Sequence, residues 1–184
     1  DKVLLAYGGG SIKKKGVYEE VIAALEKAGK TIIEFPGIME NPTYKKVLEG
    51  TKLVKEKQVD WILAVGGGSV MDCSKAISMA AVSEKDVWDE YWAKKGVVDF
   101  EPMPLGVIVT ASGTGSECNG GAVITNEEVM IKTDRDYPKC NPEFALMDPT
   151  YTYTVPTKQM VAGSFDILSH VMETYFSEPD EDNV

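Results

Sequence analysis

Short apolar runs rich in branched residues alternate with longer segments of helical period along most of the chain. This alternation is typical of βαβ units, in which parallel strands are joined by helices that cover the faces of a sheet. The apolar runs predict strands at residues 3–7, 31–35, 61–65, 105–110 and 144–147. The periodic segments predict helices at residues 17–30, 44–57, 66–81 and 158–176. We therefore expect an α/β protein with a mostly parallel sheet flanked by helices.

The region after residue 110 is less regular. Two further apolar runs, at residues 122–124 and 129–131, predict a hairpin that turns at Asn126 and Glu127. From about residue 157 the pattern changes to one helix with no strand after it, so we expect residues 1–153 to form an α/β domain and residues 154–184 to begin a helical one. The chain opens inside a strand and closes on a polar stretch, and we expect it to be a fragment of a longer protein.

Composition excludes several classes of function. The 184 residues, 43% of them hydrophobic, are enough for one sizeable core, and no apolar run approaches the roughly 18–20 residues of a membrane-spanning helix. A formal charge of -10 with a single arginine, Arg135, argues against nucleic-acid and anionic-membrane partners. The cysteines are few and widely spaced, which predicts a reducing, cytoplasmic location without disulfides. They are Cys73, Cys118 and Cys140.

Two glycine-rich turns, at residues 8–11 and 66–69, each follow an expected strand and precede a helical segment. Glycine lets the backbone approach a bound group, and a helix N-terminus offers N–H groups to a phosphate. Neither turn is a GxGxxG fingerprint, since Lys13 and Met71 occupy the third-glycine positions, and neither is a P-loop. The alternative is that each is only a tight strand–helix turn. A third polar stretch, residues 110–118, also follows an expected strand. Its hydroxyl and backbone N–H groups could bind a nucleotide, and the alternative is that it is only a surface loop.

Asp166 and His170 lie four residues apart in the last helical segment, so their side chains share one face. A carboxylate and an imidazole at this spacing can hold a divalent ion such as Fe²⁺ or Zn²⁺. The alternative is an ordinary contact on a helix surface. His170 is the only histidine, and two ligands do not complete a metal site.

Taken together, these stretches resemble the iron-containing (group III) alcohol dehydrogenases, in particular the butanol dehydrogenase and NADPH-dependent aldehyde reductase branch. The resemblance covers essentially the whole chain in the family's order. It rests on Tyr7-Gly-Gly-Gly-Ser11-Ile-Lys-Lys, Asn41-Pro42, Gly66-Gly-Gly-Ser-Val-Met-Asp72, Gly113-Thr-Gly-Ser-Glu117, Asp148-Pro149 and Gly163-Ser-Phe-Asp166-Ile-Leu-Ser-His170-Val-Met-Glu-Thr-Tyr175.

The resemblance implies a dinucleotide-binding domain followed by an all-helical metal domain, with the active site between them. It implies that the adenosine end of the cofactor meets Gly9 and Ser11, and that the nicotinamide side meets Thr110 and Thr114. The remaining cofactor-binding residues that it implies are Asn41, Gly67, Gly68, Ser69, Asp72, Lys132 and Tyr151. Asp166 and His170 match the first two metal ligands, and the other two, both histidines, are absent from this chain. No catalytic side chain is implied beyond the metal site.

The resemblance also bears on the reaction. It implies a metal-dependent oxidoreductase, using Fe²⁺ or Zn²⁺, that transfers hydride between a nicotinamide cofactor and a primary alcohol or aldehyde such as butanol or butyraldehyde. Members that prefer NAD(H) often carry Asp in the turn after the second strand, where this chain has Pro36, so NADP(H) is favoured over NAD(H). Glu34 and Glu40 are nearby carboxylates, and the preference is reversed if one of them faces the ribose. The family also implies a homo-oligomer for the full-length protein.

Two other functions remain open. One is a polyol dehydrogenase of the glycerol dehydrogenase type, which shares the architecture and uses zinc. The other is a nucleotide-binding module without catalysis, because the chain holds most of the implied cofactor-binding residues and only half of the metal ligands.

Overall fold

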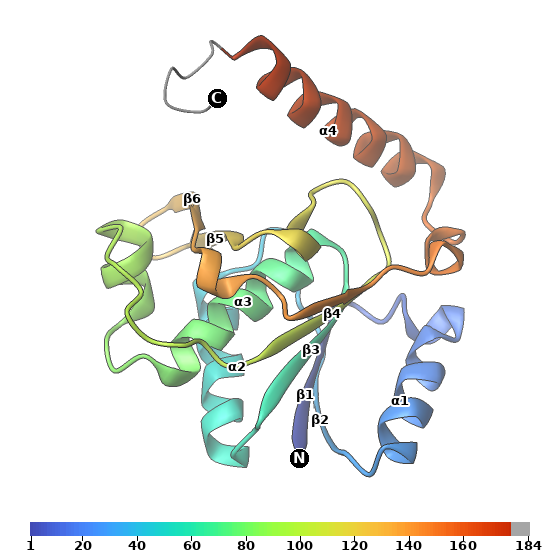
Figure 1. Ribbon diagram of the computed structural model, residues 1–184, viewed down its shortest axis with the longest axis horizontal. Coiled ribbons are helices and arrows are strands. Elements are labelled where there is room, and N and C mark those ends of the chain that lie inside the picture. The colour runs from blue at the N-terminus through green and yellow to red at the C-terminus, as the bar shows by residue number, and fades with distance from the viewer. Residues whose placement is uncertain (178–184) are drawn as a thin grey trace.

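A five-stranded parallel sheet forms the centre of the protein (Figure 1). The structure is a computed structural model that describes residues 1–177. The strand order is β2-β1-β3-β4-β7, and every neighbouring pair is parallel. The predicted α/β class with a parallel sheet is thus confirmed. The strands are β1 (Lys2–Tyr7), β2 (Thr31–Phe35), β3 (Trp61–Gly66), β4 (Leu105–Val109) and β7 (Phe144–Leu146).

Helices cover both faces of this sheet. On one face the buried side chains of α1 pack against Val3 and Leu5 of β1, and on the other face α2 and α3 pack against Leu4 and Ala6. Because successive side chains of a strand point to opposite faces, a strand covered on both sides has to be apolar throughout. The longer helices are α1 (Val17–Lys27), α2 (Tyr44–Lys57), α3 (Gly68–Val82) and α4 (Thr157–Phe176).

Short helical turns fill several of the connections. One of them, Trp88–Ala93, is a π-helix that the sequence pattern did not predict. The others are 3₁₀ turns at Lys13–Lys15, Ser116–Cys118, Pro138–Cys140 and Pro149–Thr152.

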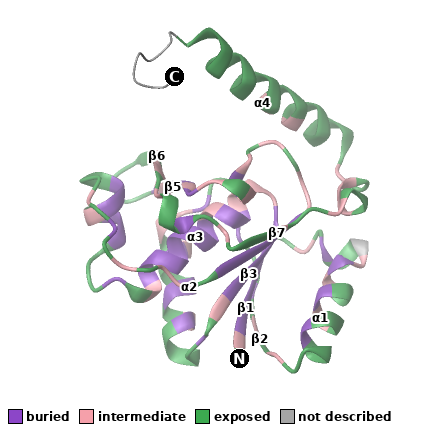
Figure 2. Cartoon of the chain, viewed as in Figure 1, coloured by how far each residue is buried: buried purple, intermediate pink, exposed green. Residues whose placement is uncertain are grey.

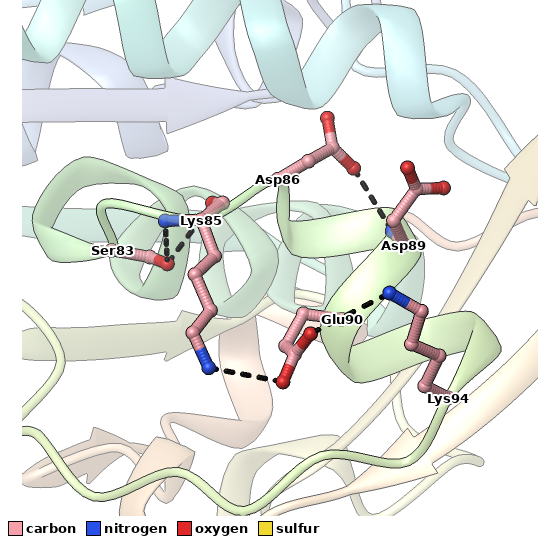
Figure 3. A network of polar contacts seen from close by, with 6 residues as sticks. All are labelled: Ser83, Lys85, Asp86, Asp89, Glu90 and Lys94. Carbon is pink, nitrogen blue, oxygen red and sulfur yellow. Dashed lines mark hydrogen bonds and ion pairs between the residues drawn. The ribbon is translucent and has the colours of Figure 1, made fainter.

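Buried aromatic side chains hold the π-helix against the rest of the domain. Trp88, Tyr91 and Trp92 are buried, and the Trp92 indole Nε1 donates a hydrogen bond to the carbonyl oxygen of Ala122, 3.3 Å away. Charged residues face outward, and Figure 3 shows the polar contacts that join this turn to the segment before it. They involve Ser83, Lys85, Asp86, Asp89, Glu90 and Lys94.

The hairpin is present, but the predicted position of its second strand is wrong. The antiparallel strands are β5 (Gly121–Asn126) and β6 (Ile131–Asp136), whereas Val129 and Met130 belong to the turn. Met130 is exposed and has a φ of 55°, a left-handed conformation. The misplacement has a physical reason: β6 has no buried residue and is largely polar, so no apolar run marks it.

Helix α4 lies at the carboxyl edge of the sheet and extends away from it (Figure 1), where residues 158–176 were predicted to be helical. None of its residues is buried (Figure 2), and its exposed residues include several large apolar ones. The division into domains at residues 153 and 154 stays a prediction, and residues 178–184 lie outside the described residues. Among residues 1–177, no helix combines the length and apolar character that a membrane crossing requires.

The close approach of α2 to α3 depends on Gly50. A Cβ atom at this buried position would lie 2.4 Å from Cδ1 of Ile77 on α3. We expect Gly50→Ala to lower the free energy of unfolding, because overpacking costs about 1–3 kcal/mol and outweighs the roughly 1 kcal/mol gained from helix propensity. Urea unfolding followed by circular dichroism measures the change.

The matched control places the same substitution in an Ile77→Val background, which lacks Cδ1. Gly50→Ala should cost less there. A Gly50→Ala protein as stable as the parent would contradict this account of the helix packing.

Candidate functional site

The loops that follow β1, β3 and β4 meet at the carboxyl edge of the sheet, because these three strands are parallel neighbours. The first two loops contain the glycine-rich turns at residues 8–11 and 66–69, and the third is the polar stretch that starts at Thr110. The amide of Thr110 donates a hydrogen bond to the carbonyl oxygen of Gly66, which ties the third loop to the second. The structure thus brings together three segments that are far apart in the sequence.

Helix α3 begins directly after β3 and points its N-terminus into this edge. Gly67 is the N-cap residue, and no side chain caps the helix there. The first hydrogen bonds of the helix run from the amides of Val70 and Met71 to the carbonyl oxygen of Gly67. The amides of Gly68 and Ser69 precede these donors, at the positive end of the helix dipole, where they can bind an anionic phosphate.

Glycine is required at this helix start by two close approaches. A Cβ atom on Gly66 would lie 2.6 Å from Cγ2 of Val70, in the first turn of the helix. On Gly68 it would lie 2.6 Å from Oγ1 of Thr114, in the loop after β4. The glycines therefore let this loop lie directly on the start of α3.

Two cavities flank the start of α3. The glycine-loop cavity, about 400 Å³, is lined by Gly9 and Ser11 from the loop after β1, by Gly67, and by Thr110 from the loop after β4. Gly68 and Ser69 line this cavity and also the second one. The helix N-terminus is thus accessible from both sides.

The hairpin cavity, about 490 Å³, lies between the start of α3 and the β5–β6 hairpin. Asn41 and Lys132 both line it, and the Lys132 Nζ donates a 2.5 Å hydrogen bond to Oδ1 of Asn41. Asp72 of α3, Thr114, and both Asp166 and His170 of α4 line it as well. Every predicted site residue other than Tyr151 therefore lines one of the two cavities.

Tyr151 lies apart from the other predicted residues. It packs with residues of β1 and α1, and its hydroxyl donates a 2.7 Å hydrogen bond to Glu20 of α1. This hydrogen bond and burial raise the pKa of the Tyr151 hydroxyl to about 12. A role for Tyr151 in binding the cofactor stays a prediction, and this placement does not support it.

The predicted metal pair is on α4, at the rim of the hairpin cavity. His170 Nε2 lies 3.8 Å from Oδ1 of Asp166, one helical turn away, and both side chains are substantially exposed. Within residues 1–177 no group of three or more histidine, cysteine, aspartate and glutamate side chains is placed to hold a metal ion. A carboxylate and an imidazole suit Fe²⁺ or Zn²⁺, so the pair fits such an ion as part of a ligand set that needs further donors.

Two glycines bring α4 to the cavity. A Cβ atom on Gly163 would lie 2.7 Å from the carbonyl oxygen of Ser112, and one on Gly113 would lie 3.3 Å from Cα of Gly163. Gly113 has a φ of 153°. The backbone contact between this loop and α4 places Asp166 beside it, because the same Cβ position on Gly113 lies 3.4 Å from Asp166 Oδ2.

The sequence analysis missed part of the hairpin cavity wall. Asp134 and Asp136 line it alongside Lys132. The three residues alternate along β6, so a period of two was the signal that could have identified them. It was overlooked because the second hairpin strand was expected earlier in the chain.

At the end of β2 the carboxylate of Glu34 is already bound. It accepts a 2.5 Å hydrogen bond from the Tyr7 hydroxyl and a 2.9 Å one from the Tyr18 hydroxyl, and the Lys13 Nζ lies 3.5 Å away. These contacts, that with Tyr7 foremost, lower the pKa of Glu34 below its ordinary value of 4.5. The turn that follows β2 carries Pro36 where a carboxylate would face a ribose.

Comparison with known proteins identifies the class. The family model for iron-containing alcohol dehydrogenase matches residues 1–149, and the chain belongs to this family. This confirms the resemblance found in the sequence.

Individual relatives agree with the family. The chain is 45% identical to the probable NADH-dependent butanol dehydrogenase 1 of Bacillus subtilis, over 95% of this chain and 44% of that protein. It is 40% identical to the NADPH-dependent aldehyde reductase YqhD of Escherichia coli, over 97% of this chain and 46% of that protein. The crystal structure of NADH-dependent butanol dehydrogenase A from Thermotoga maritima superposes with a TM-score of 0.91 at 41% identity, covering 99% of this chain and 46% of that one. The chain thus spans just under half the length of these relatives.

The Glu34 contacts predict a dependence of stability on pH. Because the folded-state pKa of Glu34 is lowered, its ionised form adds stability above about pH 4.5, and this contribution is lost as the pH falls through the folded-state value. We expect Glu34→Gln to reduce the loss of unfolding free energy on acidification below pH 4.5. Denaturant unfolding at a series of pH values measures it.

Glu19→Gln, on the exposed face of α1, is the matched control and should leave the acid dependence of the parent unchanged. An acid dependence that is identical in the Glu34→Gln protein and the parent would contradict the stabilising role of these contacts.

Proposed function

We propose that this chain binds a nicotinamide dinucleotide along the carboxyl edge of its sheet. The observation that carries the proposal is the start of α3, where Gly68 and Ser69 line both cavities. When the pyrophosphate of a dinucleotide binds at this helix N-terminus, the two ends of the dinucleotide can extend into the two cavities. The adenosine end then lies in the glycine-loop cavity beside Gly9 and Ser11, and the nicotinamide end lies in the hairpin cavity beside Thr114. Thr110, which the resemblance placed with Thr114 on the nicotinamide side, lines the glycine-loop cavity and so lies at the adenosine side in this arrangement.

The reaction we propose is hydride transfer between this cofactor and a primary alcohol or aldehyde such as butanol or butyraldehyde. It is supported by membership of the iron-containing alcohol dehydrogenase family and by relatives named as butanol dehydrogenases and an aldehyde reductase. We propose that Asp166 and His170 supply two ligands to Fe²⁺ or Zn²⁺, beside the nicotinamide end of the cofactor. When bound, the metal ion supplies Lewis-acid polarisation of the substrate oxygen.

The side chains of this chain orient the cofactor for that reaction. The α3 amides bind the pyrophosphate, the Thr114 hydroxyl lies at the start of the helix, and the Lys132 ammonium, hydrogen-bonded to Asn41, lines the hairpin cavity. No protein nucleophile is needed, because the nicotinamide accepts or donates the hydride.

We propose a preference for NADP(H) over NAD(H). An acidic side chain near the ribose accepts a hydrogen bond from the 2′-hydroxyl and repels a 2′-phosphate. Here the turn after β2 carries Pro36, and the Glu34 carboxylate is already engaged by Tyr7 and Tyr18. The relatives do not decide the preference, since their names include both NADH-dependent and NADPH-dependent enzymes.

A nucleotide-binding module without catalysis is the second candidate. In that case the chain binds the dinucleotide at the start of α3 and turns over no alcohol or aldehyde. The homo-oligomeric state of the full-length protein and its cytoplasmic location stay predictions.

The test is aldehyde-dependent oxidation of NADPH and of NADH by the longest reading frame that contains this chain, with added Fe²⁺ or Zn²⁺. We expect turnover that is abolished by a chelator, with a higher kcat/KM for NADPH than for NADH. As a control, excess metal is added back after the chelator. Recovery of turnover then shows that the chelator removed the metal and did not unfold the protein.

Turnover that favours NADH would overturn the cofactor preference and leave the metal-dependent reaction in place. Cofactor binding without turnover of any aldehyde or alcohol would overturn the dehydrogenase proposal in favour of the binding module. Turnover that persists after metal removal would contradict the roles of Asp166 and His170.

A further inference from the structure

Lys75 is a fully buried cation on α3, one turn beyond Asp72. Its Nζ donates hydrogen bonds to Oγ of Ser116 at 2.9 Å, Oδ1 of Asn119 at 3.1 Å and the carbonyl oxygen of Gly121 at 2.8 Å. An ammonium has three donors, and burying it without partners is costly. All three acceptors lie on the segment between β4 and the first residue of β5, so Lys75 fixes this segment to α3.

The contact with Ser116 sets the direction of a second hydrogen bond. The Lys75 ammonium has donors only, so the Ser116 oxygen accepts from it and keeps its own hydrogen for another acceptor. That acceptor is Oδ1 of Asp72, 2.8 Å away, while Oδ2 of Asp72 accepts from the amide of Val123 at 3.1 Å. Both oxygens of the carboxylate are therefore held, one of them through Lys75.

The charge of Lys75 also compensates that of Asp72. Burial raises the pKa of the Asp72 carboxyl, and the hydrogen bonds from Ser116 and Val123 together with the nearby Lys75 charge oppose this effect. Burial lowers the pKa of Lys75, and Asp72 is the first of the negative groups that oppose it. The two groups thus favour each other's charged forms.

Asp72 and Ser116 line the hairpin cavity, whereas Lys75 lines neither cavity. We propose that Lys75 is a positioning residue for the nicotinamide end of the cofactor, which it supports through Ser116 and Asp72 without touching it. The inference rests on the proposed function, because it needs the dinucleotide to extend into the hairpin cavity. Lys75 does not line the glycine-loop cavity, so we expect it to have no effect on binding of the adenosine end there.

Because Lys75 supports only the hairpin cavity, a positioning role can be distinguished from a general structural role by comparing ligands that bind in different cavities. Adenosine monophosphate reaches the glycine-loop cavity and has no nicotinamide, so its affinity reports only on the adenosine end. Loss of a residue that merely stabilises the domain affects both ligands alike or neither. Loss of the Lys75 support affects the dinucleotide alone.

The experiment compares Lys75→Met and Ser116→Ala with the parent in the longest reading frame that contains this chain. Dissociation constants are measured for NADPH, NADH and adenosine monophosphate by calorimetric titration, with the melting temperature recorded for each protein. We expect the dissociation constants of both dinucleotides to rise about tenfold in each variant, since Asp72 is no longer held by Ser116 and has to be ordered when the nicotinamide end binds, at a cost of about one hydrogen bond. The affinity for adenosine monophosphate stays that of the parent.

Ser78→Ala is the matched control. Ser78 is buried on the same helix and donates a 2.6 Å hydrogen bond to the carbonyl oxygen of Met103, away from both cavities. It should lower the melting temperature while leaving the affinities for all three ligands unchanged.

Three results would overturn the inference. Parallel loss of affinity for dinucleotides and adenosine monophosphate shows a general structural role, and unchanged affinities show no role. If Lys75→Met fails to fold, Ser116→Ala decides alone, because it keeps the buried charge and removes only the hydroxyl. A parent protein that binds no dinucleotide overturns the proposed function itself, and this inference with it.

Discussion

The contact between the start of α3 and the loop after β4 is the constraint on which the site depends. Two parallel strands deliver these segments to one edge of the sheet, and Gly68 lets the Thr114 side chain lie directly on the helix N-terminus. A side chain at this position would push the loop away from α3. The loop in turn carries Gly113, whose contact with Gly163 places α4 and the two predicted metal ligands, Asp166 and His170, beside the same cavity.

In this arrangement the start of α3 presents backbone amides, whereas the hairpin cavity is lined by polar and charged side chains. The helix N-terminus has glycine in place of a capping side chain at Gly67, so its first amides stay free, and these are the amides that we propose bind a pyrophosphate. Most of the charged side chains line the hairpin cavity, where Asp72, Lys132 and the α4 pair lie, whereas Glu40 is the charged side chain that lines the glycine-loop cavity. The position of the helix start between the two cavities explains how one dinucleotide can reach both.

The sequence predicted the central architecture because β1, β3 and β4 are covered on both faces and therefore read as continuous apolar runs. The predicted site residues other than Tyr151 line the two cavities, in part because the glycine turns follow directly from those strands, while their roles in binding stay predictions. The sequence pattern placed β6 wrongly, since an exposed strand that lines a cavity carries polar residues. It missed Lys75 because a lysine between helical residues resembles a solvent-facing one, and only the packing of the β4–β5 segment over α3 buries it. Tyr151 was expected among the cofactor-binding residues on resemblance alone, and its hydroxyl donates a hydrogen bond to Glu20.

The site proposed here depends on the N-terminus of α3 binding the pyrophosphate of a nicotinamide dinucleotide. The most direct test is to follow the backbone amides of Gly67, Gly68 and Ser69 by ¹H–¹⁵N NMR during titration with NADPH. The account predicts large, saturable shifts at these amides, accompanied by shifts at Gly9 and at Thr114 on either side of them. Saturable binding that leaves the three amides unmoved while other residues respond would contradict it.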